Sequence, residues 1–124
     1  MRSYIWNMDR KGEKEQDRNM SKEFVNQHIQ SSKVLIFCKS ACSCSKKAQA
    51  TFESISLKPE AVKWVEIDKR EDCAEIQDYL ESLTGARSVP RVFFNGKFFG
   101  GGDATVAAAN SGELVKLLQG VGAL

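Results

Sequence analysis

Short apolar runs alternate with helically spaced apolar positions over most of the chain. Residues 34–37 and 62–67 are rich in β-branched and aromatic side chains, which predicts two buried strands. Apolar residues spaced three and four apart predict helices over residues 46–57 and 73–83, and Gly85 follows the second of these as a stop signal.

The C-terminal part of the chain predicts a hairpin and two further helices. Asn95-Gly96 separates two Phe-Phe pairs, and this dipeptide suits the positive φ angles of a type I′ turn. Asp103 is expected to cap an alanine-rich helix, and residues 113–118 predict one more short helix. With a further helix expected after Ser21, and the two C-terminal helices counted together as the last α, the order is α-β-α-β-α-β-β-α. This order predicts an α/β fold in which helices cover both faces of a small mixed sheet.

The N-terminal residues have a different pattern. Eight of the ten residues from 9 to 18 are charged, and such a segment buries too little apolar surface to offset its ordering entropy. We therefore expect residues 1–20 to be a charged, flexible extension and residues 21–124 to be the folded domain. Ser21 is the expected N-cap of a helix that places Phe24 and Val25 on one face.

Composition narrows the classes of function. The chain has 124 residues, about one domain, and its 18 basic and 16 acidic side chains give a net charge of only +2. This balance predicts neither nucleic-acid binding nor a polybasic membrane surface. The sequence also lacks a membrane-length apolar run and the apolar core of a signal peptide. We expect a protein of the cytoplasm or another reducing intracellular compartment.

Three of the four cysteines, Cys38, Cys42 and Cys44, lie within seven residues, whereas Cys73 stands apart. This clustering predicts a reactive or metal-binding thiol site rather than a disulfide scaffold. Cys42 follows a strand and precedes a helix, where backbone N–H groups and the helix dipole favour a thiolate. Three lysines, Lys39, Lys46 and Lys47, add positive potential, so the pKa of Cys42 is expected below the usual ~8.5.

Two other thiols and the histidine have structural rather than chemical interpretations. Cys38 and Cys73 are expected to be structural thiols, and His28 a packing or surface residue. A structural zinc site built on the cysteine cluster is an alternative that lacks a second pair of ligands.

The sequence resembles the glutaredoxins, which have a thioredoxin-like fold with a four-stranded mixed sheet. Residues 37–48, FCKSACSCSKKA, are similar to the family's F-S-K-S-Y-C-P-Y-C-K-K-A. Ser88-Val89-Pro90 is similar to its T-V-P turn, and Asn95-Gly96-Lys97 with residues 100–103 is similar to its N-G-x…G-G-x-D segment. The resemblance covers residues 22–120, so the domain of residues 21–124 is expected to be a glutaredoxin domain.

The active-site segment differs from the C-P-Y-C branch that it resembles most. Cys42 matches the nucleophilic cysteine, but Ser45 stands at the second cysteine, so the site, C-S-C-S, is monothiol by position. Cys44 replaces the tyrosine and is a candidate auxiliary thiol. Ser43 replaces the proline, and Ala104 replaces a second acidic residue found in many members.

The resemblance also implies a glutathione groove. Lys39, Gln77 and Arg87 match positions around the glycyl carboxylate, and Ser88 and Val89 match the segment that pairs with the cysteinyl backbone. Pro90 would be cis. The γ-glutamyl end would lie at the residues that open a helix: Gly101, Gly102, Asp103 and Ala104.

Two functions follow from the resemblance. The first is a glutathione-dependent thiol–disulfide oxidoreductase that reduces glutathione mixed disulfides of proteins or small thiols by a monothiol mechanism through Cys42. The alternative is a homodimer that binds a [2Fe–2S] cluster through Cys42 and glutathione. The protein is accordingly expected to be a monomer, or a homodimer when a cluster is bound.

Overall fold

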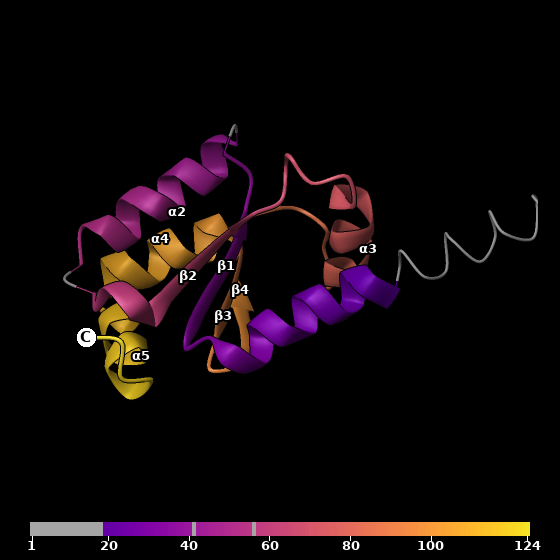
Figure 1. Cartoon of the computed structure of the whole chain (residues 1–124). Coiled ribbons are helices and arrows are strands. Elements are labelled where there is room, and N and C mark those ends of the chain that lie inside the picture. Colours follow the sequence, from indigo (N-terminus) through magenta and orange to yellow (C-terminus); the bar gives the residue numbers. More distant parts are fainter. Residues whose placement is uncertain (1–18, 41, 56) are drawn as a thin grey trace, which may run out of the picture.

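A four-stranded sheet lies at the centre of the computed structural model, and helices cover both faces (Figure 1). The structure describes residues 19–40, 42–55 and 57–124. The strands are β1 (Val34–Cys38), β2 (Val62–Glu66), β3 (Arg91–Phe94) and β4 (Lys97–Gly100). Their order in the sheet is β2-β1-β3-β4, with β1 parallel to β2 and the other two pairings antiparallel. The predicted α/β fold with a four-stranded mixed sheet is confirmed.

Two hydrophobic cores lie on opposite faces of the sheet because successive side chains of a strand point in opposite directions. One face is covered by α2 (Ser43–Glu53), α4 (Gly102–Ser111) and α5 (Glu113–Gly120), which pack over Val34 and Ile36. The other face is covered by α3 (Cys73–Thr84) and a helix whose described part spans residues 19–31, which pack over Leu35 and Phe37. Figure 1 shows these two helical layers on either side of β1 and β3.

The helix after β1 differs from its predicted range of residues 46–57. Cys42 has the extended backbone of an N-cap, so α2 begins at Ser43, three residues earlier than expected. The helix ends at Glu53, and the chain enters the short helix η1 (Pro59–Ala61) through Lys58, which is extended as residues before proline usually are. Ile55 and Leu57 supply the helical spacing but pack on the core from this connection.

Both predicted N-caps are wrong. Residues 19 and 20 are already helical, so Ser21 lies inside its helix; its buried hydroxyl donates to Oδ2 of Asp72, 2.9 Å away. Gly101, rather than Asp103, is the N-cap of α4, because the extended chain of β4 continues to that residue. Asp103 lies in the first turn of α4, where its charge interacts favourably with the helix dipole.

The predicted hairpin is confirmed, with Asn95 at φ 51° and Gly96 at φ 84° joining β3 to β4. The expected extension, residues 1–20, falls almost entirely outside the described part of the chain and stays a prediction. No helix among the described residues is both long and apolar enough to cross a membrane.

Candidate thiol active site

The sheet topology brings four connections to one edge. The carboxyl ends of the parallel strands β1 and β2 lie together, with Cys38 opposite Glu66. Because β3 is antiparallel to β1, its first residue, Arg91, lies at the same end, opposite Phe37. Gly100 at the end of β4 pairs with Val92, next to Arg91. The residues that follow β1, precede β3 and follow β4 therefore meet at this edge, as the sequence resemblance implied.

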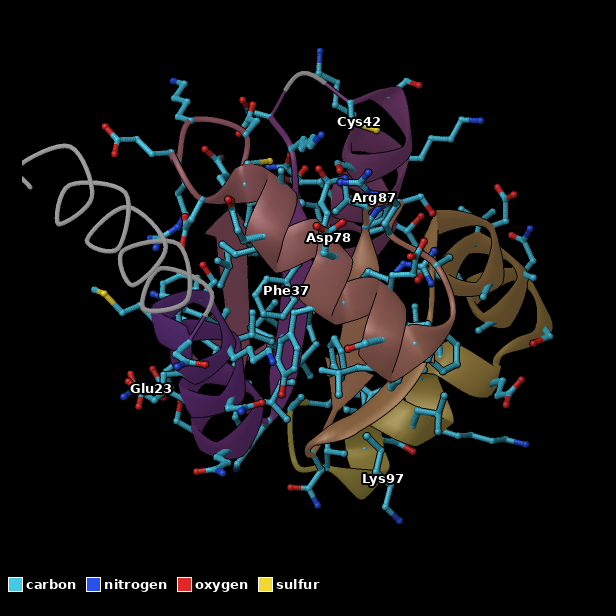
Figure 2. All side chains as sticks on the ribbon, turned by 90° about the vertical axis from the view of Figure 1, so that its right-hand side faces the viewer. Glu23, Phe37, Cys42, Asp78, Arg87 and Lys97 are labelled. Atoms are coloured by element: carbon cyan, nitrogen blue, oxygen red, sulfur yellow. The ribbon has the colours of Figure 1, made fainter. Side chains whose placement is uncertain are left out.

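Cys42 is the half-buried N-cap of α2, with its sulfur at the beginning of the helix. Its carbonyl oxygen accepts the first helical hydrogen bond from Lys46, at 3.1 Å. Its Sγ lies 3.9 Å from the carbonyl oxygen of Val89. The N–H groups of the first turn and the absence of acidic residues there favour a thiolate at this position. Figure 2 shows Cys42 and Arg87 in the upper part of the view and Lys97 at the opposite end of the molecule.

Ser45 occupies a buried position below the cysteine loop. Its Oγ accepts a hydrogen bond of 3.1 Å from the backbone N–H of Lys39. This contact joins the first turn of α2 to the end of β1, and it fixes the loop that carries Cys42. The residue at the second cysteine position of the family thus has a structural hydrogen bond and no thiol.

A second contact holds the same loop from the side of β2. Oδ2 of Asp68 accepts hydrogen bonds from the backbone N–H and the hydroxyl of Ser40, at 3.1 and 2.6 Å. Asp68 follows β2, so this carboxylate ties the loop after β1 to the loop after its parallel neighbour. Sequence reasoning missed Asp68, because its partner is 28 positions away.

The segment before β3 faces Cys42. The Val89–Pro90 peptide bond is cis, as the resemblance implied, and both residues are buried. The guanidinium of Arg91 donates from Nε to the carbonyl oxygen of Ser88 and from Nη2 to its hydroxyl, the latter at 2.7 Å. Arg91 is itself buried, and this burial lowers the pKa of its guanidinium.

Gln77 and Arg87 are brought together at the end of this segment. Nε2 of Gln77 donates to the carbonyl oxygen of Arg87 at 3.0 Å, while its Oε1 accepts from Sγ of Cys73 at 3.5 Å. The exposed Arg87 side chain lies 3.5 Å from a carboxylate oxygen of Asp78. These contacts leave Arg87 at the rim of the site, where a carboxylate ligand can compete for it.

Two small residues, Gly100 and Ala104, are in close contact at the start of α4. A Cβ placed on Gly100 would lie 2.7 Å from Cβ of Ala104, so a larger side chain at Gly100 would displace the first turn. The carbonyl oxygen of Gly101 accepts from both the N–H and the hydroxyl of Thr105, at 3.1 and 2.9 Å. Asp103 and Lys47 line an open surface groove between α4 and α2, which lie side by side.

The remaining thiols have different environments. Cys38 is buried and donates to the carbonyl oxygen of Val65; burial, Glu66 and Asp68 together raise its pKa to about 11. It is a structural thiol, as expected, and Cys73 is a half-buried thiol at the start of α3. The side chain of Cys44 lies outside the described part of the structure.

His28 packs edge-on against Phe24, 4.7 Å between ring centroids, which fits its expected packing role. Burial, followed by Lys63 and Arg70, lowers the pKa of His28. Among the described residues, no group of three or more His, Cys, Asp or Glu side chains is arranged to hold a metal ion.

Comparison with known proteins places these features in a family. The sequence model of the glutaredoxin family matches residues 34–99. The chain is 47% identical to rice (Oryza sativa subsp. japonica) Glutaredoxin-C8 over 96 residues, which is 77% of this chain and 70% of that protein.

Two solved structures have the same fold. The crystal structure of oxidized glutaredoxin 2 from Chlamydomonas reinhardtii superposes with a TM-score of 0.79 at 42% identity, over 86% of this chain and 98% of the other. The crystal structure of a buckwheat glutaredoxin–glutathione complex superposes with a TM-score of 0.80 at 29% identity, over 89% and 97%. Glutaredoxins are in general glutathione-dependent thiol oxidoreductases. The matched sequence and the matched structures together show that this chain belongs to the glutaredoxin family.

Proposed function

We propose that this protein reduces mixed disulfides between glutathione and protein or small thiols through Cys42 alone. Two facts together carry the proposal. Cys42 is half-exposed at the N-terminus of α2, and the residue at the second cysteine position is a buried serine, Ser45. A single nucleophilic thiol suffices for this reaction, whereas direct reduction of a protein disulfide through a C-x-x-C pair requires the missing thiol.

The reaction has two exchange steps. The Cys42 thiolate attacks the glutathione sulfur of the mixed disulfide; the Cys42–glutathione disulfide forms, and the substrate leaves as a thiolate that takes up a proton. A second glutathione, as thiolate, then attacks the glutathione sulfur of that disulfide, which releases glutathione disulfide and restores the Cys42 thiolate. The free glutathione is oxidised as its sulfur enters glutathione disulfide, and the substrate sulfur is reduced to a thiol. Each turnover therefore consumes one free glutathione, and no other reductant is needed.

The glutathionyl half of the substrate is proposed to lie in the groove formed by the residues around Cys42. The proximity of Val89 to the Cys42 sulfur supports this placement, because a ligand cysteine paired with the Val89 backbone would hold its sulfur near Cys42. Arg87, Gln77 and Lys39 would bind the glycyl carboxylate, and the first turn of α4, residues Gly101 to Ala104, would bind the γ-glutamyl end. The relative crystallised with glutathione supports the same choice of ligand.

Single-cysteine substitutions test the proposal. Turnover of a glutathionylated peptide can be measured by the glutathione that it consumes. This turnover should disappear in Cys42→Ser and remain close to the wild-type rate in Cys44→Ser. A matched substitution, Cys73→Ser, controls for the loss of a half-buried thiol elsewhere. Turnover by Cys42→Ser, or its loss in Cys44→Ser, would contradict the monothiol mechanism.

Cluster binding stays a prediction. Four thiolates are required, and Cys42 of one chain supplies one, so glutathione and a second copy of the chain would supply the others. A visible absorption spectrum of protein purified without oxygen and with glutathione, recorded across a sizing column, decides this question. A brown dimer would support cluster binding. A colourless monomer would contradict cluster binding and leave the reductase as the single proposed function.

A further inference from the structure

Arg91 is a buried cation directly beneath the proposed glutathione groove. The side chain is only 9% exposed, and it lies at the start of β3, immediately after the cis peptide bond of Pro90. Its guanidinium donates hydrogen bonds to the carbonyl oxygen and the hydroxyl of Ser88, one residue before Val89. A buried guanidinium retains its positive charge, so these bonds are charge-assisted and stronger than neutral ones.

The hydrogen bond from Nε of Arg91 to the Ser88 carbonyl oxygen also fixes the orientation of the next backbone N–H, that of Val89. The carbonyl oxygen of Ser88 and the N–H of Val89 belong to one planar peptide unit, and the only cis bond among the described residues is Val89–Pro90. In a trans peptide these two groups point in opposite directions. Because the Ser88 carbonyl is directed inward to Arg91, the N–H of Val89 is directed away from Arg91, to the side where the ligand backbone is proposed to lie.

Arg91 also contacts the other half of the groove. A Cβ placed on Gly101 would lie 3.6 Å from Nη2 of Arg91 and 3.4 Å from the carbonyl oxygen of Pro90. The N-cap of α4 therefore packs directly on the guanidinium and on the segment before β3. The ring of Phe98 in β4 lies on a further side, 5.3 Å between its centroid and Cζ, within the range of a cation–π contact.

We propose that Arg91 is a positioning residue for glutathione, which aims the Val89 N–H into the groove and keeps the Ser88–Pro90 segment in register with the start of α4. This inference rests on the proposed function. Arg91 itself does not contact the ligand in this account. Its loss should weaken binding of the glutathionyl half equally in the ground state and the transition state, which raises KM and leaves kcat unchanged.

Two substitutions separate positioning from general stability. Arg91→Met keeps an unbranched chain of similar length without donors, and Arg91→Lys keeps the charge without the planar fork that reaches two acceptors. We expect KM for a glutathionylated peptide to rise about tenfold in Arg91→Met and less in Arg91→Lys, with kcat near the wild-type value.

Arg70→Met is the matched control. Arg70 also stacks on a phenylalanine, with Cζ 3.8 Å from the Phe24 centroid, and bonds Asp72, neither of which belongs to the groove. This variant should melt at a lower temperature while its KM stays that of the wild type. Equal KM values in wild type and folded Arg91→Lys and Arg91→Met would overturn the inference.

A measurement without turnover addresses the Val89 N–H directly. In the Cys42→Ser background, which removes covalent exchange, reduced glutathione should shift the Val89 amide resonance, and the additional Arg91→Lys substitution should diminish that shift. An undiminished shift would overturn the inference even if Arg91→Met does not fold. Failure of the wild type to turn over the glutathionylated peptide would instead overturn the proposed function, and the inference with it.

Discussion

Single residues decide which of the cysteines can react. Cys42 and Cys38 are four positions apart, yet one lies at a helix N-terminus and the other in a buried strand. The sequence predicted both environments, because an apolar run followed by a lysine-containing loop indicates where the chain leaves the sheet. It did not predict the contacts that hold the loop, such as Ser45 with the Lys39 N–H, since hydrogen bonds depend on three-dimensional positions.

Alkylation should distinguish these two thiols. The pKa of Cys38, raised to about 11 by burial and by two nearby carboxylates, leaves almost no thiolate at pH 7, whereas the helix N-terminus favours the Cys42 thiolate. Iodoacetamide followed by peptide mass mapping should therefore label Cys42 rapidly and leave Cys38 unmodified until the protein is unfolded in urea. Labelling of Cys38 in the folded protein at the rate seen in urea would contradict this environment.

At the scale of the elements, the interiors of helices and strands were predictable and their ends were less so. The two-residue turn at Asn95-Gly96 was found because its φ angles demand these residue types. The start of α2 was missed because its N-cap is Cys42, and cysteine is not one of the residue types that mark an N-cap in a sequence. The role of Ser21 was missed because its partner, Asp72, is 51 positions away and joins the N-terminal helix to α3.

The contact between these two helices should depend on pH. Hydrogen bonds from Arg70 and Ser21 lower the pKa of Asp72 below its usual 3.8, although burial opposes this shift. A depressed carboxyl pKa contributes stability that is present above pH 3.8 and is lost as pH falls through the folded-state value. Asp72→Asn should therefore lower the midpoint of urea unfolding at pH 7, and the difference from wild type should shrink as the pH approaches 3.

Exposed Asp78 provides the matched control for this element. Its carboxylate contacts Arg87 at 3.5 Å on the surface, so Asp78→Asn should change the unfolding midpoint little at either pH. An Asp72→Asn protein whose stability difference from wild type is the same at pH 7 and pH 3 would show that the carboxylate charge does not matter there.

For the whole molecule, the fold places the proposed reaction at one edge of the sheet. Four strand ends converge there, so the loop with Cys42, the segment before Pro90 and the start of α4 form one site from distant parts of the sequence. The sequence located these parts because each resembles a family motif. It did not identify Arg91, which packs between two of them, because that arrangement exists only after β3 and β4 pair.

In the proposed mechanism, Cys42 alone carries the glutathionyl group. Mixing the reduced wild-type protein with a glutathionylated peptide without free glutathione, quenching with acid and mapping the modified cysteine by mass spectrometry tests it most directly. We expect one glutathionyl group on Cys42 and one equivalent of released peptide thiol. An intramolecular disulfide between Cys42 and Cys44, or a glutathionyl group carried by Cys44 or Cys73 while Cys42 stays reduced, would contradict it.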